Sequence, residues 1–310
     1  MRTMVLGAGA LGCYFDARLQ DAGHDVTYVA RGDHLDAMKA NGLRVEIPSG
    51  DIRLDRVHTV TAPAEAGPAD LVLFAVKNYD VEQAAAELSA VIEPGAVVIT
   101  VQNGVSAQPH LAERFGRDRV LPGAVYMPTD MKSPGVIRVS AEQTGLTFGA
   151  YEGGVTERAQ RVFDTLTASG VPASLSEDIW KTLWLKFILM SALAPITAMT
   201  RLDIGPIRHN AASRGMLRNL LDEAAAIARA EHPTVPSDAA DTTFEFLLKV
   251  PPSVHASMLD DLLRGKRLEL EWYSGEVIRR GARHGIDTPS HSFAYAVLAP
   301  TIDGRPEGSH

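Results

Sequence analysis

The sequence is short of cysteine, of basic charge and of long apolar runs. Cys13 is the only cysteine in 310 residues, so the chain can form no internal disulfide and a reducing, cytoplasmic compartment is expected. The formal net charge of -8 disfavours nucleic acid or an anionic membrane as a main partner. The most apolar stretch, residues 184–199, is interrupted by Lys186 and Pro195. It therefore predicts a core helix and not a membrane span.

Two further absences limit the chemistry. A strand-like run begins within the first residues, at Thr3, so we expect no signal peptide. The histidines are scattered, and no pair has the spacing of metal ligands, so we expect no metal site. Nothing in the sequence separates a monomer from a homodimer.

The order of predicted elements divides the chain in two. Over the first 175 residues, β-branched runs alternate with helical patterns, which is typical of a parallel sheet with crossover helices. Later residues show only helical periodicity. The predicted strands are 3–6, 25–29, 71–75, 97–100, 120–125, 135–139, 146–148 and 173–175, with antiparallel pairing expected for the last three. The predicted helices after them are 179–192, 213–230, 238–249, 254–264 and 268–283. We therefore predict a Rossmann-like α/β domain at 1–177, an all-helical domain at 178–303 and a disordered tail at 304–310.

A glycine-rich loop follows the first predicted strand. It has the pattern G-x-G-x-x-G and consists of Gly7, Ala8, Gly9, Ala10, Leu11 and Gly12. Alone the pattern is weak, but here it opens a helix and precedes a second strand, which is the context of a dinucleotide-binding fold. The first glycine permits the tight turn, the second admits the pyrophosphate, and the third lets helix and strand pack closely. A purely structural turn is the alternative.

The second strand ends on a basic residue. An NAD site would place Asp or Glu there for the ribose 2′-hydroxyl, but Asp25 begins the strand and Arg31 follows its end. A guanidinium suits a 2′-phosphate, so the sequence predicts NADP(H). Lys77 and Asn103 each follow a later strand, where the ligand crevice of such folds lies. Surface cations, and a plain turn at Asn103, are the alternatives.

Several short motifs occur in one order along the chain. They are GAGALG at 7–12, Arg31, AVK at 75–77, QNG at 102–104, WLK at 184–186, PITA at 195–198, SMLDD at 257–261 and LELE at 268–271. In this order they resemble the ketopantoate reductase (2-dehydropantoate 2-reductase) family over nearly the whole chain. The resemblance implies a 6-phosphogluconate dehydrogenase-like fold and NADPH-dependent reduction of a small-molecule 2-keto acid to a 2-hydroxy acid.

The resemblance also implies roles for individual residues. Lys186 would donate the proton to the carbonyl oxygen, and Glu269 would be a catalytic residue that contacts cofactor and ligand. Ser257 would bind the substrate carboxylate. The residues implied to contact the cofactor are those of the glycine loop, Arg31, Lys77, Asn103, Thr129 and Glu269, with Thr129 in a looser alignment and Asn103 between nicotinamide and substrate.

The surroundings of Lys186 in the sequence support a catalytic role. The predicted helix is strongly apolar, with Trp184 and Phe187 beside the lysine, and an unpaired ammonium there would be costly. Partial burial should lower the pKa of Lys186 toward working pH, which suits a general acid. A lysine exposed on a helix face is the alternative, as is a solvated charged stretch for Glu269.

Met190 and Ala194 depart from the family pattern, which has asparagines at both positions. Helical spacing places both on the face of Lys186. A third family asparagine, expected near residues 203–205, is also unmatched. Since these amides hold a hydroxylated substrate in the family, their loss predicts a more apolar wall and a less hydroxylated substrate. Reduction of an imine or of a carbonyl that is not a 2-keto acid, and NADPH sensing without catalysis, stay open.

The spacing of Ser257 and Glu269 sets a geometric condition. They are twelve residues apart, or about 18 Å along a straight helix. Both can contact one small substrate only if the chain bends between them, and Gly265 is the expected place.

Overall fold

The computed structural model describes residues 1–141 and 145–305, which fall into two units. Unit 1 comprises Met1–Gln102 and Ala107–Trp180, and unit 2 comprises Asn103–Ser106 and the chain from Lys181 onward. The sequence boundary expected after residue 177 therefore differs slightly from this division. The sequence did not indicate that residues 103–106 belong with the helices. Most of the predicted tail, 306–310, lies outside the described residues.

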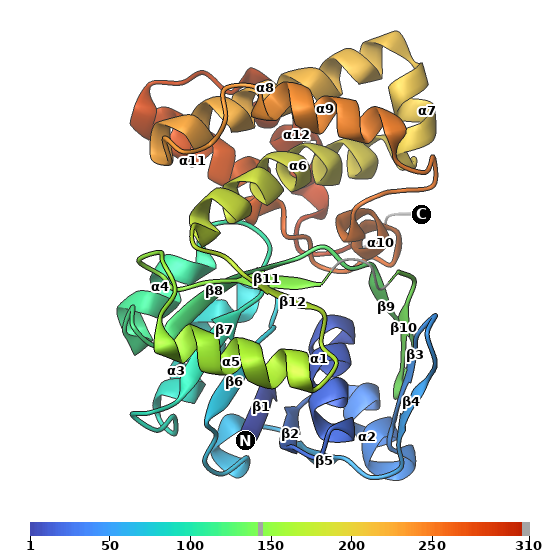
Figure 1. The fold of residues 1–310 in the computed structure, drawn as a ribbon. Helices are drawn as coiled ribbons and strands as arrows, with labels where there is room; N and C mark the ends of the chain where they lie inside the picture. The colour runs from blue at the N-terminus through green and yellow to red at the C-terminus, as the bar shows by residue number, and fades with distance from the viewer. Residues whose placement is uncertain (142–144, 306–310) are drawn as a thin grey trace. The chain divides into compact units, whose positions relative to one another are not determined.

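Unit 1 is built on an eight-stranded sheet with the order β12-β11-β8-β7-β6-β1-β2-β5 (Figure 1). Its strands are β1 (Arg2–Leu6), β2 (Asp25–Val29), β5 (His58–Val60), β6 (Leu71–Phe74), β7 (Val97–Thr100), β8 (Val120–Val125), β11 (Leu146–Phe148) and β12 (Ala173–Leu175). From β5 to β8 all neighbours are parallel, which gives the 3-2-1-4-5-6 order of a dinucleotide-binding fold. The antiparallel pairing expected for the later strands is right for β11 on β8 and wrong for β12, which is parallel to β11.

Apolar clusters cover both faces of this sheet. In β6, Leu71 and Leu73 enter one cluster, and Val72 and Phe74 enter the other. All four residues are buried, which explains why the strand shows no polar alternation. The helices on the first face are α1 (Ala10–Asp21), α2 (Gly32–Asn41) and α5 (Glu157–Ala168); those on the second are α3 (Val81–Ser89) and α4 (Ala107–Phe115). Short 3-10 turns are η1 (Pro63–Glu65) and η2 (Asn78–Asp80).

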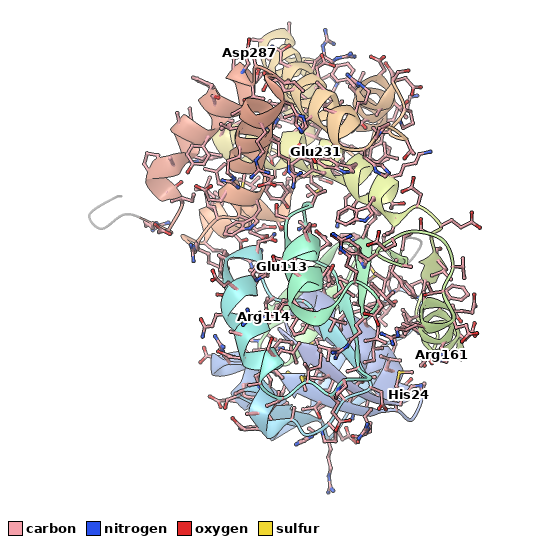
Figure 2. All side chains as sticks on the ribbon, turned by 90° about the vertical axis from the view of Figure 1, so that its left-hand side faces the viewer. His24, Glu113, Arg114, Arg161, Glu231 and Asp287 are labelled. Atoms are coloured by element: carbon pink, nitrogen blue, oxygen red, sulfur yellow. The ribbon has the colours of Figure 1, made fainter. Side chains whose placement is uncertain are left out.

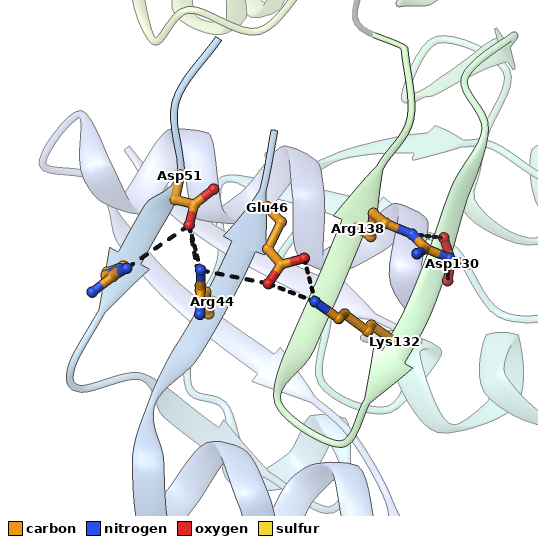
Figure 3. Close-up of polar contacts among 7 residues, drawn as sticks. Arg44, Glu46, Asp51, Asp130, Lys132 and Arg138 are labelled. Atoms are coloured by element: carbon orange, nitrogen blue, oxygen red, sulfur yellow. Dashed lines mark hydrogen bonds and ion pairs between the residues drawn. The ribbon is translucent and has the colours of Figure 1, made fainter. Parts of the chain in front are cut away.

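A second sheet of unit 1 has the order β4-β3-β10-β9. Its strands are β3 (Leu43–Glu46), β4 (Ile52–Leu54), β9 (Thr129–Ser133) and β10 (Val136–Val139). One face buries apolar side chains such as Val45 and Ile137. The other face carries ion pairs between strands, among them Lys132 of β9 with Glu46 of β3 at 2.9 Å, which reaches across the intervening strand β10 (Figure 3). The sequence predicted only β10 of these strands, because the others are short and half polar.

Unit 2 is helical, and its longest helix is α6 (Ile179–Thr200). The prediction ended this helix at Ala192, which is wrong, because the helix continues through Pro195. The residues around the proline are buried, and their packing offsets the lost backbone hydrogen bond. In the described part of the chain α6 alone is long and apolar enough to span a membrane, but 72% of its most apolar window is buried within the protein, as expected of a core helix. The remaining elements are α7 (Ile204–His209), α8 (Ala211–Glu231), α9 (Ala239–Lys249), α10 (Ser257–Leu263), η3 (Leu270–Trp272), α11 (Ser274–His284), α12 (Pro289–Leu298) and η4 (Ala299–Thr301).

The chain breaks between α10 and α11. The helix predicted over 268–283 is wrong in its first part, because Leu270–Trp272 forms a single 3-10 turn and α11 begins only at Ser274. Gly265 follows the end of α10 with a φ of 65°, a left-handed conformation that glycine adopts without strain. The straight helix that would have separated Ser257 from Glu269 is therefore not formed.

Candidate active site

The glycine loop joins β1 to α1 at the carboxyl end of the strand. Gly7 has a φ of 94°, and a Cβ there would lie 2.6 Å from the backbone nitrogen of Val76. A Cβ at Gly12 would lie 2.6 Å from Cγ2 of Val5. At Gly9, in contrast, a Cβ would meet no described atom within 4 Å, and the φ of −82° suits any residue. The protein's own packing thus requires the first and third glycines, whereas the second leaves room in front of the helix.

The space beside Gly9 fits a phosphate group. Gly9 is the N-cap of α1, and no side chain of the described chain caps this helix end. Exposed amides and the positive end of the helix dipole favour an anion there. Within the loop Ala8 is buried, while Ala10 and Leu11 are half-buried. The loop therefore has both the space and the polarity for a pyrophosphate.

Two predicted cofactor residues follow the strands on either side of β1. Arg31 lies past the end of β2 with 65% of its side chain exposed, and its guanidinium is 3.7 Å from the carboxylate of Glu87 in α3. Lys77 follows β6 and is half-buried. Because β2, β1 and β6 are adjacent and parallel, these cations and the glycine loop share one edge of the sheet. Thr129 begins β9 in the second sheet and is half-buried.

Lys186 is a buried cation in α6. Its side chain is 6% exposed, and burial lowers its pKa from 10.5 to about 8. The negative charge of Glu269 acts in the opposite direction and raises the pKa of Lys186. Glu269 is itself buried, at 5% exposure. The structure therefore brings together two charged residues from separate segments, and it shows that Lys186 is not an exposed surface lysine.

Asn103 joins this group through Tyr273. Its side chain hydrogen-bonds to the phenol of Tyr273, which is buried between η3 and α11. Burial, and then the negative charges of Glu269 and Asp261, raise the pKa of Tyr273 well above its ordinary value, so the phenol is neutral at physiological pH. Tyr273 was not predicted from the sequence, where its only signal is that it closely follows the LELE motif.

The predicted substrate residues differ in exposure. Ser257 is the exposed first residue of α10, one turn before Asp261 on the same face. Met190 is half-buried, one turn after Lys186, whereas Ala194 is fully buried. Of the two positions that depart from the family asparagines, Met190 alone presents accessible surface.

One cavity of unit 1 lies beside the first turn of α5. It has a volume of about 790 Å³, and its lining includes Arg117, Arg158 and Arg161, the last on the exposed side of α5 (Figure 2). Each arginine pairs with a nearby carboxylate; Arg117, for example, lies 2.7 Å from Glu152. None of the candidate residues lines this cavity. Within residues 1–141 and 145–305, no three His, Cys, Asp or Glu side chains are grouped to hold a metal.

Both parts of the chain match models of the same protein family. Residues 3–153 match the family "Ketopantoate reductase PanE/ApbA", and residues 178–301 match "Ketopantoate reductase PanE/ApbA C terminal". The chain is 34% identical over 289 residues to a 2-dehydropantoate 2-reductase of Archaeoglobus fulgidus, with 92% of each chain covered.

Solved structures with the same fold include two kinds of enzyme. A PanE/ApbA family ketopantoate reductase from Ralstonia eutropha JMP134 has a TM-score of 0.90 and 32% identity, covering 97% of this chain and 98% of the other. A D-mandelate dehydrogenase, solved with NADH and anilino(oxo)acetate, has a TM-score of 0.87 at 19% identity, covering 97% and 98%. The second likeness concerns the fold alone.

Proposed function

Since the chain belongs to the ketopantoate reductase PanE/ApbA family, we propose that it is an NADPH-dependent reductase of a 2-keto acid. The observation that carries this proposal is the buried Lys186, whose pKa of about 8 suits proton donation near neutral pH. Glu269 lies beside it, and Asn103 belongs to the same unit. A protein that only sensed NADPH would have no need to bury an ammonium at this cost.

The cofactor would be held by unit 1. The glycine loop and the start of α1 would bind the pyrophosphate, and Arg31 with Lys77 would bind the 2′-phosphate. Bound in this way, NADPH supplies the hydride to the carbonyl carbon of the substrate. A D-mandelate dehydrogenase of the same fold was solved with NADH, so the fold alone does not select NADPH. We assign the preference for NADPH to Arg31 in particular.

Unit 2 would supply the proton and the substrate contacts. Nζ of Lys186 donates a proton to the carbonyl oxygen, which becomes the hydroxyl of the 2-hydroxy acid, and solvent then returns a proton to the amine. The charge of Glu269 keeps a larger fraction of Lys186 protonated than burial alone would allow. The carboxamide of Asn103 orients the reactants, and the exposed hydroxyl of Ser257 binds the substrate carboxylate.

The substrate would be a 2-keto acid with an apolar side chain. Met190 presents a thioether one turn from Lys186, where the family pattern has an amide for a substrate hydroxyl. A thioether packs well against aliphatic carbon, but it is only a weak hydrogen-bond acceptor for a substrate hydroxyl. The fully buried Ala194 cannot replace the missing amide.

Initial rates of NADPH oxidation with a panel of carbonyl compounds test the function and the substrate class. We expect 2-keto acids with aliphatic or aromatic side chains to give a higher kcat/KM than ketopantoate, and Met190→Asn to shift the ratio toward ketopantoate about tenfold. Preference of the wild type for ketopantoate would overturn the substrate class. Turnover restricted to imines or to carbonyls without a carboxylate would overturn the 2-keto acid. NADPH binding without any turnover would indicate a sensor.

Cofactor titrations with two charge variants test the choice of NADPH. Arg31→Ala should raise the Kd for NADPH about tenfold or more and leave the Kd for NADH nearly unchanged, since one charge-assisted pair is lost. Glu87→Gln should lower the Kd for NADPH severalfold, because Glu87 competes with a phosphate for Arg31. Arg53→Ala, which alters a side chain that is 68% exposed in the same unit, is the matched control. Equal losses for both cofactors would contradict the assignment.

A further inference from the structure

Tyr273 is a buried polar side chain that has no role in the mechanism proposed above. It is 2% exposed, and it stands between the 3-10 turn that begins after Glu269 and the helix α11. A buried phenol oxygen loses its hydrogen bonds to water, and a partner within the protein offsets this cost. That partner is the side chain of Asn103, which lies far from Tyr273 in the sequence.

The residue after Asn103 approaches the same segment closely. Gly104 has a φ of 92°, and a Cβ there would lie 3.3 Å from the carbonyl oxygen of Trp272. The consecutive residues Trp272 and Tyr273 thus contact the consecutive residues Asn103 and Gly104. This pairing explains why residues 103–106 belong to unit 2, although they directly follow the strand β7 of unit 1.

The residue before Asn103 is held in a different way. Nε2 of Gln102 donates to the carbonyl oxygens of Phe74 at 2.8 Å and Val76 at 3.1 Å, both within unit 1. Gln102 is therefore fixed to the end of β6, whereas the next side chain is fixed to Tyr273. Two anchors on consecutive residues leave the backbone at this point little freedom.

The hydrogen bond to the phenol of Tyr273 restrains rotation of the Asn103 carboxamide. Glu269 and Asp261, the charged groups near the phenol, favour its neutral form, so the bond persists across the working pH range.

We propose that Tyr273 is a positioning residue, which holds the carboxamide of Asn103 in the orientation needed for reduction and fixes residues 103–106 to unit 2. The inference rests on the proposed function in one respect, since it is there that Asn103 acts on the reactants. An amide that rotates freely spends part of its time in unproductive orientations, and small errors of placement lower the rate of the chemical step more than they weaken binding.

A double-mutant cycle of Tyr273→Phe and Asn103→Ala tests the positioning role. Phenylalanine keeps the ring and removes only the hydroxyl. We expect Tyr273→Phe to lower kcat about tenfold with less than a threefold change in KM and in the Kd for NADPH, and to have no further effect in the Asn103→Ala background. An equal loss in both backgrounds would show that Tyr273 does not act through Asn103 and would overturn the proposal, as would an unchanged kcat in the single variant.

Hydrogen exchange of the backbone amides at 103–106 tests the anchoring without any turnover. Tyr273→Phe should accelerate this exchange about tenfold, because the segment loses one of its anchors. Thr243→Ala is the control, since it removes a hydroxyl that donates to the carbonyl oxygen of Ala239 within α9. Unchanged exchange in Tyr273→Phe would overturn the anchoring. A wild type without reductase activity would refute the proposed function, while the exchange result would still decide the anchoring.

Discussion

Units 1 and 2 assemble their candidate residues by different physical means. In unit 1 the glycine loop, Arg31 and Lys77 each follow one of three adjacent parallel strands, so backbone topology places them at one edge. In unit 2 Lys186 and Glu269 come from segments distant in the sequence and meet because helices pack together. The cofactor residues of unit 1 therefore depend on the space that the backbone leaves, whereas Lys186 and Glu269 depend on desolvation and charge.

Removing the buried ammonium should have the largest effect on unit 2. Lys186→Ala should lower kcat by about 10²–10⁴, the range for loss of a general acid, with the Kd for NADPH little changed. Lys249→Ala, which alters a side chain that is 78% exposed in α9, is the matched control. Steady-state kinetics and cofactor titration measure both effects. Retained turnover in Lys186→Ala would remove the lysine from the chemistry.

Two alanine variants of the glycine loop should separate cofactor binding from stability in unit 1. Gly9→Ala should leave the Tm within a few degrees and raise the Kd for NADPH about 10- to 100-fold, because its Cβ enters only the space proposed for the pyrophosphate. Gly12→Ala should lower the free energy of unfolding by about 1–3 kcal/mol, because its Cβ would overlap Val5. Thermal melts and cofactor titrations distinguish them. Similar losses of Tm in both variants would refute the contrast.

The pH dependence of kcat tests whether Lys186 of unit 2 is the general acid. A general acid acts in its protonated form, and burial places the pKa of Lys186 at about 8. The rate of reduction should therefore be maximal below pH 8 and fall about tenfold per unit above it. Glu269→Gln removes the charge that raises this pKa, so the fall should begin at lower pH. A profile that is flat up to pH 10 would contradict the assignment.

The strands and helices predicted most accurately are those with strong local patterns. The strands β2, β7, β8, β11 and β12 have the bounds that the sequence indicated. In β7 and β8 both faces are covered and nearly every residue is apolar. The strands β3, β4, β5 and β9 were missed, since a short strand with one exposed face resembles a loop. The start of α11 was wrong because Leu and Glu alternate just before it, and local propensity does not show where packing ends a helix.

The cofactor loop, the order of the motifs and the place of Lys186 in an apolar helix were all evident from the amino-acid sequence. A turn and the strand before it are local, so their residues carry the information. Three features depend on the packing of distant segments: Glu269 lies near Lys186, Tyr273 hydrogen-bonds to Asn103, and Ala194 is fully buried. Burial and charge interactions depend on which distant segments surround a side chain, and no local pattern specifies those neighbours.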